Sequence, residues 1–269
     1  VSLYKFPRTP HLTSLHRVCC KGGFMSRTLL FLALLMCVHV GFAQNWTWVP
    51  SHGPYGGPIR ALVVDTNDIV FAGTETRGVF VSDDRGESWD QTELRSMKIA
   101  DLALDSLGAV LAAGPDQLYR SADGGHHWSG LLPPGVTIAP TCIAAAADQK
   151  ILLGTAKGFY WSLNGGVGWT VWTLSASRVT SVAITRSGAW LVGLSSRMYR
   201  STDQGQSWAA TESTFTPTAF SSEVPDTVYA GSDMKGFYIS VNDGISWSLR
   251  ATASGKTVSH IERGVEGTL

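Results

Sequence analysis

Short apolar segments alternate with polar, turn-forming segments along most of the chain. The stretches 61–64 and 101–104 are typical apolar segments, and the residues between such stretches are rich in Gly, Asp, Asn and Ser. Short apolar runs bounded by turn residues predict β-strands. A sustained apolar stretch that could form a helix occurs only near the N-terminus, at residues 29–38. The pattern therefore predicts an all-β protein.

One eight-residue segment, Ser-x-Asp/Asn-x-Gly-x-x-Trp, recurs five times, and its tryptophans are spaced 39, 41, 39 and 39 residues apart. An aromatic residue stands nine positions before each tryptophan, and each repeat contains four short apolar runs. Four strands in about 40 residues predict one blade of a β-propeller. The residues of the segment are Ser82, Asp84, Gly86, Trp89; Ser121, Asp123, Gly125, Trp128; Ser162, Asn164, Gly166, Trp169; Ser201, Asp203, Gly205, Trp208; and Ser240, Asn242, Gly244, Trp247.

The repeated segment has the composition of a hairpin turn between the third and fourth strands of each blade. The Asp or Asn side chain can accept hydrogen bonds from backbone N–H groups two residues further on. The glycine can adopt a positive φ angle that other residues resist. We expect the tryptophan to open the fourth strand and to lie across the turn or the interface between blades.

This segment resembles the Asp-box, or BNR repeat, of the sialidase-like β-propellers, and the resemblance covers about residues 58–254. Bacterial sialidases, xyloglucan-active glycosidases, sortilin-type receptors and photosystem II assembly factors share this motif. The resemblance implies that the box is structural and lies away from the functional face. It therefore indicates a fold and not an activity.

Blades are expected at about residues 58–97, 98–138, 139–178, 179–216 and 217–255. Residues 45–50 resemble a lone fourth strand and 257–261 a lone first strand. We expect residues 45–50 and 256–269 to contribute to one shared, partial blade, whose other strands would lie in sequence beyond this chain. The complete propeller would then have six, seven or more blades. The alternative is a five-bladed ring with two additional end strands.

The N-terminal region predicts export. A short basic segment at 25–27, the apolar run 29–38 and small residues before position 44 are typical of a signal peptide cleaved after Ala43. Residues 1–24 would be an upstream untranslated or disordered segment, and 44–269 the mature propeller, secreted, periplasmic or at the cell surface. Cys142 is the one cysteine after Ala43, so no internal disulfide is expected, and its apolar neighbours indicate a core residue.

Charge argues against nucleic acid as a partner. The formal net charge of the 269 residues is zero, but residues 1–43 carry five basic and no acidic residues. The remainder has 16 basic and 21 acidic residues, a formal charge of −5. A mildly acidic body would repel a phosphate backbone. The apolar run at 29–38 is too short for a membrane span of about 20 residues, so no span is expected after signal cleavage.

The sequence contains no clear catalytic constellation. Glycoside hydrolysis usually needs two carboxylates flanking the bond, and no acidic residue stands out as a candidate. The tyrosines in register with the repeat are expected in the core, and Asp65 and Asp105 in turns. His126 and His127 would face opposite sides of a strand, which does not suit one metal ion. No motif calls for a metal or a cofactor, so none is expected.

Binding residues are expected in the loops on the face opposite the boxes, because loops on a rigid scaffold commonly carry binding residues. The candidates are Tyr55, Glu75, Arg77, Arg95, Trp172 and Arg178. We expect an exported, non-catalytic module that binds or scaffolds a protein or carbohydrate partner. One alternative is a sialidase-like or xyloglucanase-like glycoside hydrolase whose catalytic residues lie partly outside this chain. A second alternative is a propeller resembling the photosystem II assembly factors.

Overall fold

The computed structural model describes residues 4–5, 49–50, 53–55, 57–132, 138–146, 148–172, 177–195, 197–252 and 255–261. The stretch 25–43, for which the sequence predicts a signal peptide, and residues 45–48 and 262–269 lie outside these ranges. The chain divides into two compact units, residues 2–51 and 52–269. Within the described ranges no helix is long and apolar enough to cross a membrane.

In the first unit, β1 (Tyr4–Lys5) pairs with β2 (Val49–Pro50) in an antiparallel ladder. Val49 and Pro50 are the two described residues of the segment 45–50, so the shared blade of 45–50 and 256–269 stays a prediction.

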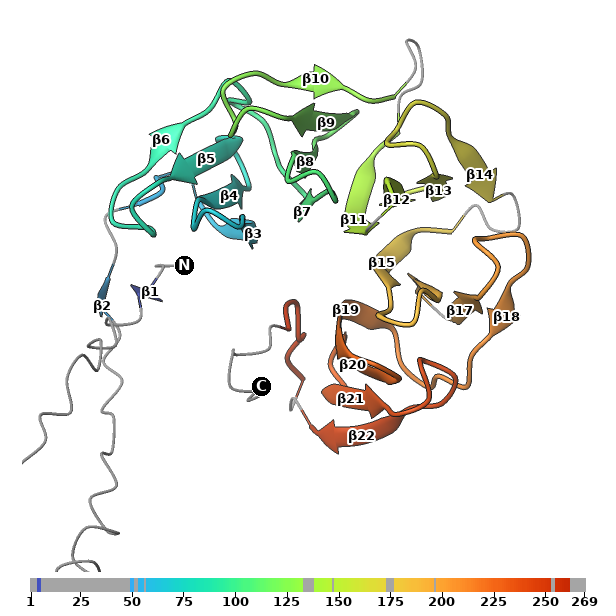
Figure 1. Cartoon of the computed structure of the whole chain (residues 1–269). Coiled ribbons are helices and arrows are strands. Elements are labelled where there is room, and N and C mark those ends of the chain that lie inside the picture. The colour runs from blue at the N-terminus through green and yellow to red at the C-terminus, as the bar shows by residue number, and fades with distance from the viewer. Residues whose placement is uncertain are drawn as a thin grey trace, which may run out of the picture. The chain divides into compact units, whose positions relative to one another are not determined.

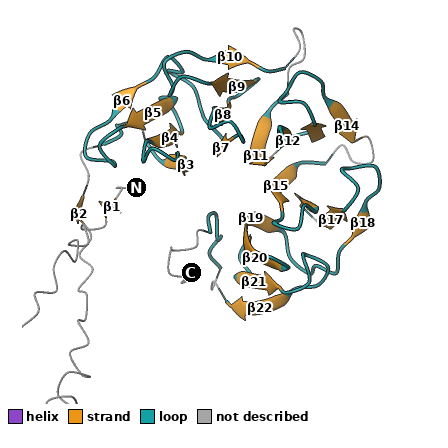
Figure 2. Ribbon diagram, in the orientation of Figure 1, coloured by secondary structure: helices purple, strands orange, loops and turns teal. Residues whose placement is uncertain are grey.

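The second unit is a propeller of five blades, each a four-stranded antiparallel sheet with its strands in chain order. Figures 1 and 2 show the blades following one another around an arc, each with its first strand innermost. Blade 1 consists of β3 (Ile59–Val64), β4 (Val70–Thr74), β5 (Val79–Ser82) and β6 (Asp90–Gln91). Blade 2 consists of β7 (Asp101–Leu104), β8 (Val110–Ala113), β9 (Leu118–Ser121) and β10 (Ser129–Gly130). Blade 3 consists of β11 (Pro140–Ala146), β12 (Lys150–Thr155), β13 (Gly158–Ser162) and β14 (Thr170–Trp172). Blade 4 consists of β15 (Val179–Ile184), β16 (Trp190–Leu194), β17 (Met198–Ser201) and β18 (Ala209–Ala210). Blade 5 consists of β19 (Pro217–Val224), β20 (Thr227–Ser232), β21 (Phe237–Ser240) and β22 (Ser248–Ala251).

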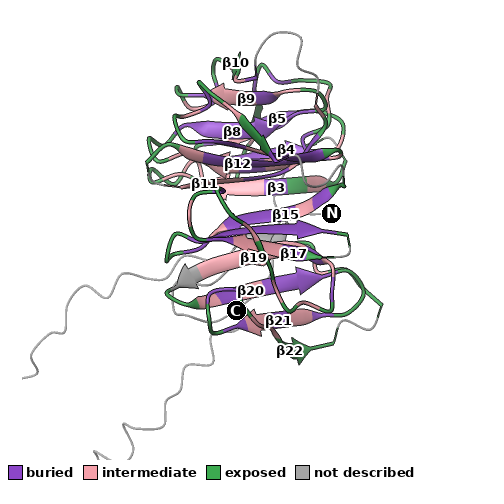
Figure 3. Cartoon of the chain, turned by 90° about the vertical axis from the view of Figure 1, so that its right-hand side faces the viewer, coloured by how far each residue is buried: buried purple, intermediate pink, exposed green. Residues whose placement is uncertain are grey.

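The core lies between the blades. The second strand of each blade is the most buried, as Figure 3 shows for β4, β8, β12 and β20. Between blades 3 and 4 an aromatic cluster fills the interface, in which Trp172 stacks on Trp208 with ring centroids 4.9 Å apart. Trp208, the box tryptophan of blade 4, thus packs on blade 3. Burying such large faces between sheets favours successive blades packing together.

Residues 255–261 continue the geometry of the blades beyond β22. The backbone N–H of Val258 donates to the carbonyl of Ser232, as the N–H of Ile99 at the start of blade 2 donates to Thr74. A Cβ on Gly231 would lie 2.8 Å from Val258 Cγ1, just as one on Gly73 would lie 2.7 Å from Ile99 Cγ2. The segment therefore takes the position in which the inner strand of a following blade begins.

Candidate functional site at the centre of the loop face

Each Asp-box is a closed hydrogen-bonded turn on one face of the propeller, called here the box face. In blade 1, Ser82 Oγ donates to Asp84 Oδ1 (2.7 Å), and Oδ1 accepts from the N–H groups of Glu87 and Ser88 (both 2.8 Å). The N–H of Gly86 donates to Ser82 Oγ (2.7 Å). The side chain therefore accepts from residues three and four positions on, not two, because the serine and glycine bonds tighten the intervening turn.

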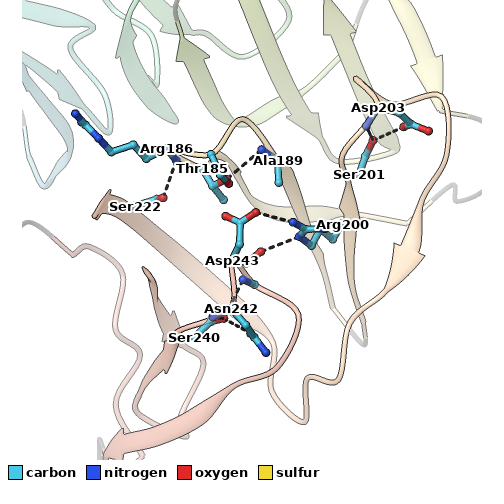
Figure 4. Close-up of polar contacts among 12 residues, drawn as sticks. Thr185, Arg186, Ala189, Arg200, Ser201, Asp203, Ser222, Ser240, Asn242 and Asp243 are labelled. Carbon is cyan, nitrogen blue, oxygen red and sulfur yellow. Dashed lines mark hydrogen bonds and ion pairs between the residues drawn. The ribbon is translucent and has the colours of Figure 1, made fainter. Parts of the chain in front are cut away.

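Three of these bonds recur in the other four boxes, including those with asparagine: the serine hydroxyl donates to the Asp or Asn oxygen, the glycine N–H donates to the serine, and the N–H four positions on donates to the Asp or Asn oxygen. Figure 4 shows the contact between serine and Asp or Asn at Ser201 and Asp203 and at Ser240 and Asn242. The hydroxyl of Ser207 holds the pKa of Asp203 at about 2, and the hydroxyl of Ser88 holds that of Asp84 well below its usual range. His127 fills the corresponding place in blade 2, where its Nδ1 lies 2.6 Å from Asp123 Oδ2. The serine hydroxyl and the Asp or Asn side chain that define each box are thus engaged within their own turn.

The box glycines have a second constraint besides their φ angles of 84–93°. A Cβ on Gly205 would lie 3.0 Å from the Trp161 ring of blade 3, and one on Gly244 2.7 Å from Leu191 of blade 4. Each of these turns therefore closes against the preceding blade, and a side chain at the glycine would separate the two.

The opposite face, called the loop face, carries the turns between second and third strands and the connections from one blade to the next. At its centre the inner strands surround a cavity of about 220 Å³. Its polar lining comes from the starts of these strands and from the segment after β22: Arg60, Asp101, Thr141, Cys142, Thr180, Ser181, Thr218, Ser259 and His260. Five of these residues carry a hydroxyl group, so the wall is rich in hydrogen-bonding groups: Thr141, Thr180, Ser181, Thr218 and Ser259.

Asp101 is the acidic residue among the described residues of this wall. Its Oδ1 accepts from the N–H of Leu102 (2.9 Å) and its Oδ2 from the N–H of Ile143 in blade 3 (2.8 Å). Burial nevertheless raises the pKa of Asp101 to about 6, because two backbone bonds do not replace full hydration of the charged carboxylate. The charge of His260 acts in the opposite direction and lowers the pKa.

Cys142 occupies the position in blade 3 that Asp101 occupies in blade 2, since each faces the end of the second strand in its sheet. Its thiol is free and buried. Burial, and then the charge of Asp101, raise the pKa of Cys142 to about 12. The thiol is therefore protonated at neutral pH and is a poor nucleophile.

Hydroxyl groups connect neighbouring blades around the cavity. Thr141 Oγ1 donates to the carbonyl of Val179 in blade 4 (2.8 Å), and Thr218 Oγ1 makes the equivalent bond to Val258 (2.5 Å). Thr180, at the same position of blade 4, is different, because its Oγ1 is buried and has no partner among the described residues. A buried hydroxyl without a partner costs about 1–3 kcal/mol, so this atom is suited to bond a ligand.

The binding residues predicted from the sequence lie in different places in the structure. Glu75 forms ion pairs with Arg60 and with Lys98 (3.0 Å) beside the cavity, and these bonds lower its pKa. Arg77 and Arg178 are exposed on the loop face, and Tyr55 is 74% exposed. Arg95 lines a groove between blades 1 and 2.

Trp172 does not lie on the exposed loop surface, where the sequence interpretation placed it. It is 7% exposed and forms part of the aromatic cluster between blades 3 and 4. Sequence reasoning also did not select Asp101 or His260, although an acidic residue opening an apolar strand is a signal that could have found Asp101. Among the described residues, no group of three or more His, Cys, Asp or Glu side chains is placed to hold a metal ion.

Five four-stranded blades, each carrying the same closed turn, define a β-propeller built of BNR/Asp-box repeats. The BNR/Asp-box repeat family model matches residues 199–210, in blade 4. A comparison with curated protein sequences found no match.

Solved structures of different kinds share the fold. The extracellular domain of BT4673 from B. thetaiotaomicron has 12% identity and a TM-score of 0.66, over 80% of this chain and 30% of that one. Virginiamycin B lyase from Staphylococcus aureus, in complex with quinupristin, has 12% identity and a TM-score of 0.65, over 79% and 77%. The GH74 enzyme of Niastella koreensis has 18% identity and a TM-score of 0.55, over 78% and 35%. The chain thus spans less than a third of the BT4673 domain, and at these identities the likeness concerns the fold.

Proposed function

We propose that the chain is a non-catalytic binding module that receives a polar group of a protein or glycan partner in the central cavity of the loop face. The observation that carries the proposal is the wall of this cavity, where hydroxyls, one carboxylate and one imidazole converge from several blades and from the segment after β22. A small number of polar groups that converge on a rigid frame is typical of ligand sites. At about 220 Å³, the cavity suits one sugar ring or one side chain more than an extended ligand.

Thr180 provides the sharpest test. Thr180→Val keeps the shape of the side chain and removes the unpartnered hydroxyl, so binding should weaken about 3- to 10-fold while the fold is retained. Thr211→Val is the matched control, because Thr211 Oγ1 is also buried without a partner but lies outside the cavity lining. The measurement is a glycan and peptide array with both variants, followed by titration of the best ligand. Equal affinity of Thr180→Val and the unchanged chain would contradict the proposal.

A glycoside hydrolase is the second candidate, and the pKa of Asp101 is the observation that favours it. A carboxyl group with a pKa of about 6 suits a general acid. However, Asp101 is the one carboxylate among the described residues that line the cavity, whereas hydrolysis usually requires two. Turnover of fluorogenic glycosides that disappears in Asp101→Asn would establish the enzyme and exclude the binding module.

Export is part of the proposal. It rests on the signal-peptide pattern of residues 25–43 and is in keeping with the BT4673 neighbour being an extracellular domain. N-terminal sequencing of the protein recovered from a secreting host should begin at Gln44. A mature protein that still begins at Met25 would contradict export by a cleaved signal.

A further inference from the structure

A second, larger hollow lies on the box face, between blades 1 and 2. It is a groove of about 780 Å³ with Ile69, Phe71 and Val81 of blade 1 on one side and the box turn of blade 2, including Gly125, on the other. It is separate from the central cavity, since the two share no lining residue. The groove is not used in the function proposed above.

Blade 2 shows which side-chain interaction the equivalent position of a blade can form. In blade 2, Asp105 Oδ1 accepts from the N–H groups of Leu107 and Ala109, and Oδ2 forms an ion pair with Arg120 (2.8 Å). In blade 1, Asp65 is the equivalent residue, because Val64 before it pairs with Val70 as Leu104 pairs with Val110.

Asp65 is held in the same way but lacks the arginine. Its Oδ1 accepts from the N–H groups of Asn67 and Ile69, both at 2.8 Å, as in blade 2. Val81 stands where blade 2 has Arg120, so the one partner of Asp65 Oδ2 among the described residues is the side-chain amide of Asn67, at 3.2 Å. The carboxylate is therefore oriented for a guanidinium that its own blade does not supply.

Large side chains occupy the position of Val81 in blades 3 and 4. Trp161 fills the gap against the box of blade 4, where it would meet a Cβ of Gly205 at 3.0 Å. Arg200 crosses from blade 4 to blade 5, where its Nη2 bonds Asp243 Oδ2 (2.5 Å) and its Nε the Asp243 carbonyl (2.8 Å), as Figure 4 shows. Val81 is too short to cross to blade 2, whose Gly125 packs instead on Phe71 and Thr92, each 3.2 Å from a Cβ placed on this glycine, and a groove remains beside this contact.

The groove is also strongly acidic. Besides Asp65, it is lined by Asp83, Asp90 and Glu93, whose side chains are exposed and have no hydrogen-bond or ion-pair partner among the described residues. Asp123, bonded within its own box, and His126 also line the groove. Arg95 is the arginine in the lining, and its Nε is engaged by the carbonyl of Thr92 (3.1 Å). Unpaired carboxylates above an apolar floor favour a long side chain with an aliphatic stem and a cationic head.

We propose that this groove binds an arginine side chain of a partner polypeptide. The guanidinium pairs with Asp65 Oδ2, as Arg120 pairs with Asp105 in blade 2, and the aliphatic stem lies on Ile69 and Val81. The three unpaired carboxylates attract a basic segment and set the preference for arginine-rich sequence. Arginine suits the site better than lysine because its planar fork can bond two carboxylate oxygens at once.

The test is fluorescence anisotropy with the full chain and a labelled peptide of alternating glycine and arginine. A matched peptide carries citrulline, which has the shape of arginine without the charge. The arginine peptide should bind, with affinity falling as salt rises. The citrulline peptide should bind at least about tenfold more weakly, since charge-assisted hydrogen bonds are lost. No binding of the arginine peptide, or equal binding of the two, would overturn the proposal.

Two variants locate the site. Val81→Arg places an arginine from the chain itself on Asp65, so it should reduce peptide binding at least about tenfold and raise the melting temperature. Its control is Val167→Arg, which adds the same charge at a position 86% exposed and outside the groove. Asp65→Asn should also weaken binding, and its control is Asp148→Asn, outside the groove. Binding that survives both groove variants, or that falls equally in the controls, would show that the peptide binds elsewhere.

Discussion

The raised pKa of Asp101 makes the stability of the propeller depend on pH in a defined direction. The pKa is about 6 in the folded chain against 3.8 for the unperturbed group. The stabilisation is fully present below pH 3.8, where both states are protonated, and is lost as the pH rises through 6, because the folded state must then hold a buried charge. A shift of about two pKa units corresponds to about 3 kcal/mol in the free energy of unfolding. Since the carboxylate faces a cavity that water can enter, we take about 2 kcal/mol as the expected loss.

Asp101→Asn removes this dependence. The variant keeps the bond from one backbone N–H and loses the other, which costs about 1 kcal/mol at all pH values. The difference in unfolding free energy between the chain and the variant should therefore change by about 2 kcal/mol between pH 4 and 7.5, in favour of the variant at high pH. Urea unfolding at closely spaced pH values measures this difference. The box aspartates titrate far below this window, as Asp203 does at about 2. A difference that is constant with pH would refute the reasoning.

Three further predictions concern the frame around the site. Asp203→Ala should lower the melting temperature and leave loop-face binding unchanged, because the partners of this carboxylate among the described residues all lie in its own turn; lost binding at an unchanged melting temperature would oppose this. Gly154→Ala should cost about 1–3 kcal/mol in urea unfolding, since the new Cβ would lie 2.4 Å from Cys142 Sγ, and Cys142→Ala in the same chain should recover part of the loss. Absence of recovery would exclude this contact as the cause. The thiol of Cys142 should react with a thiol reagent such as 5,5′-dithiobis(2-nitrobenzoate) only after unfolding, because it is buried and has a pKa of about 12; rapid reaction in the native protein would contradict its burial.

The blades could be predicted because the information for each is local. A turn closed by Ser82, Asp84 and Gly86 depends on residues within one short segment, and the constant spacing of the tryptophans repeats that segment five times. The number of strands per blade follows from the apolar runs between boxes. Which backbone N–H groups bond the Asp side chain was harder to predict from the sequence. The bonds of Asp84 to the residues three and four positions on arise from the closed turn as a whole.

The candidate site could be predicted only in part. The loop face and the charged residue Glu75 followed from the repeat and its variable positions. Trp172 was misplaced, because an apolar ring beside a loop packs into a neighbouring blade whenever that blade offers a matching surface, and Trp208 of blade 4 does so. Asp101 was missed, since it lies at an ordinary strand position, whereas the burial predicted for Cys142 is confirmed.

What the sequence determined by itself is the repeated unit: the strands, the closed box turn and the aromatic residues that pack between blades. These features depend on neighbours close in the chain or on a pattern that recurs with one period. What only the tertiary structure decided is which positions meet. The inner strands bring Asp101, Thr180 and His260 to one cavity, and the absence of a large side chain at Val81 leaves a groove open beside Asp65. Both depend on the packing of separate blades, where each distance is set by side chains far apart in sequence.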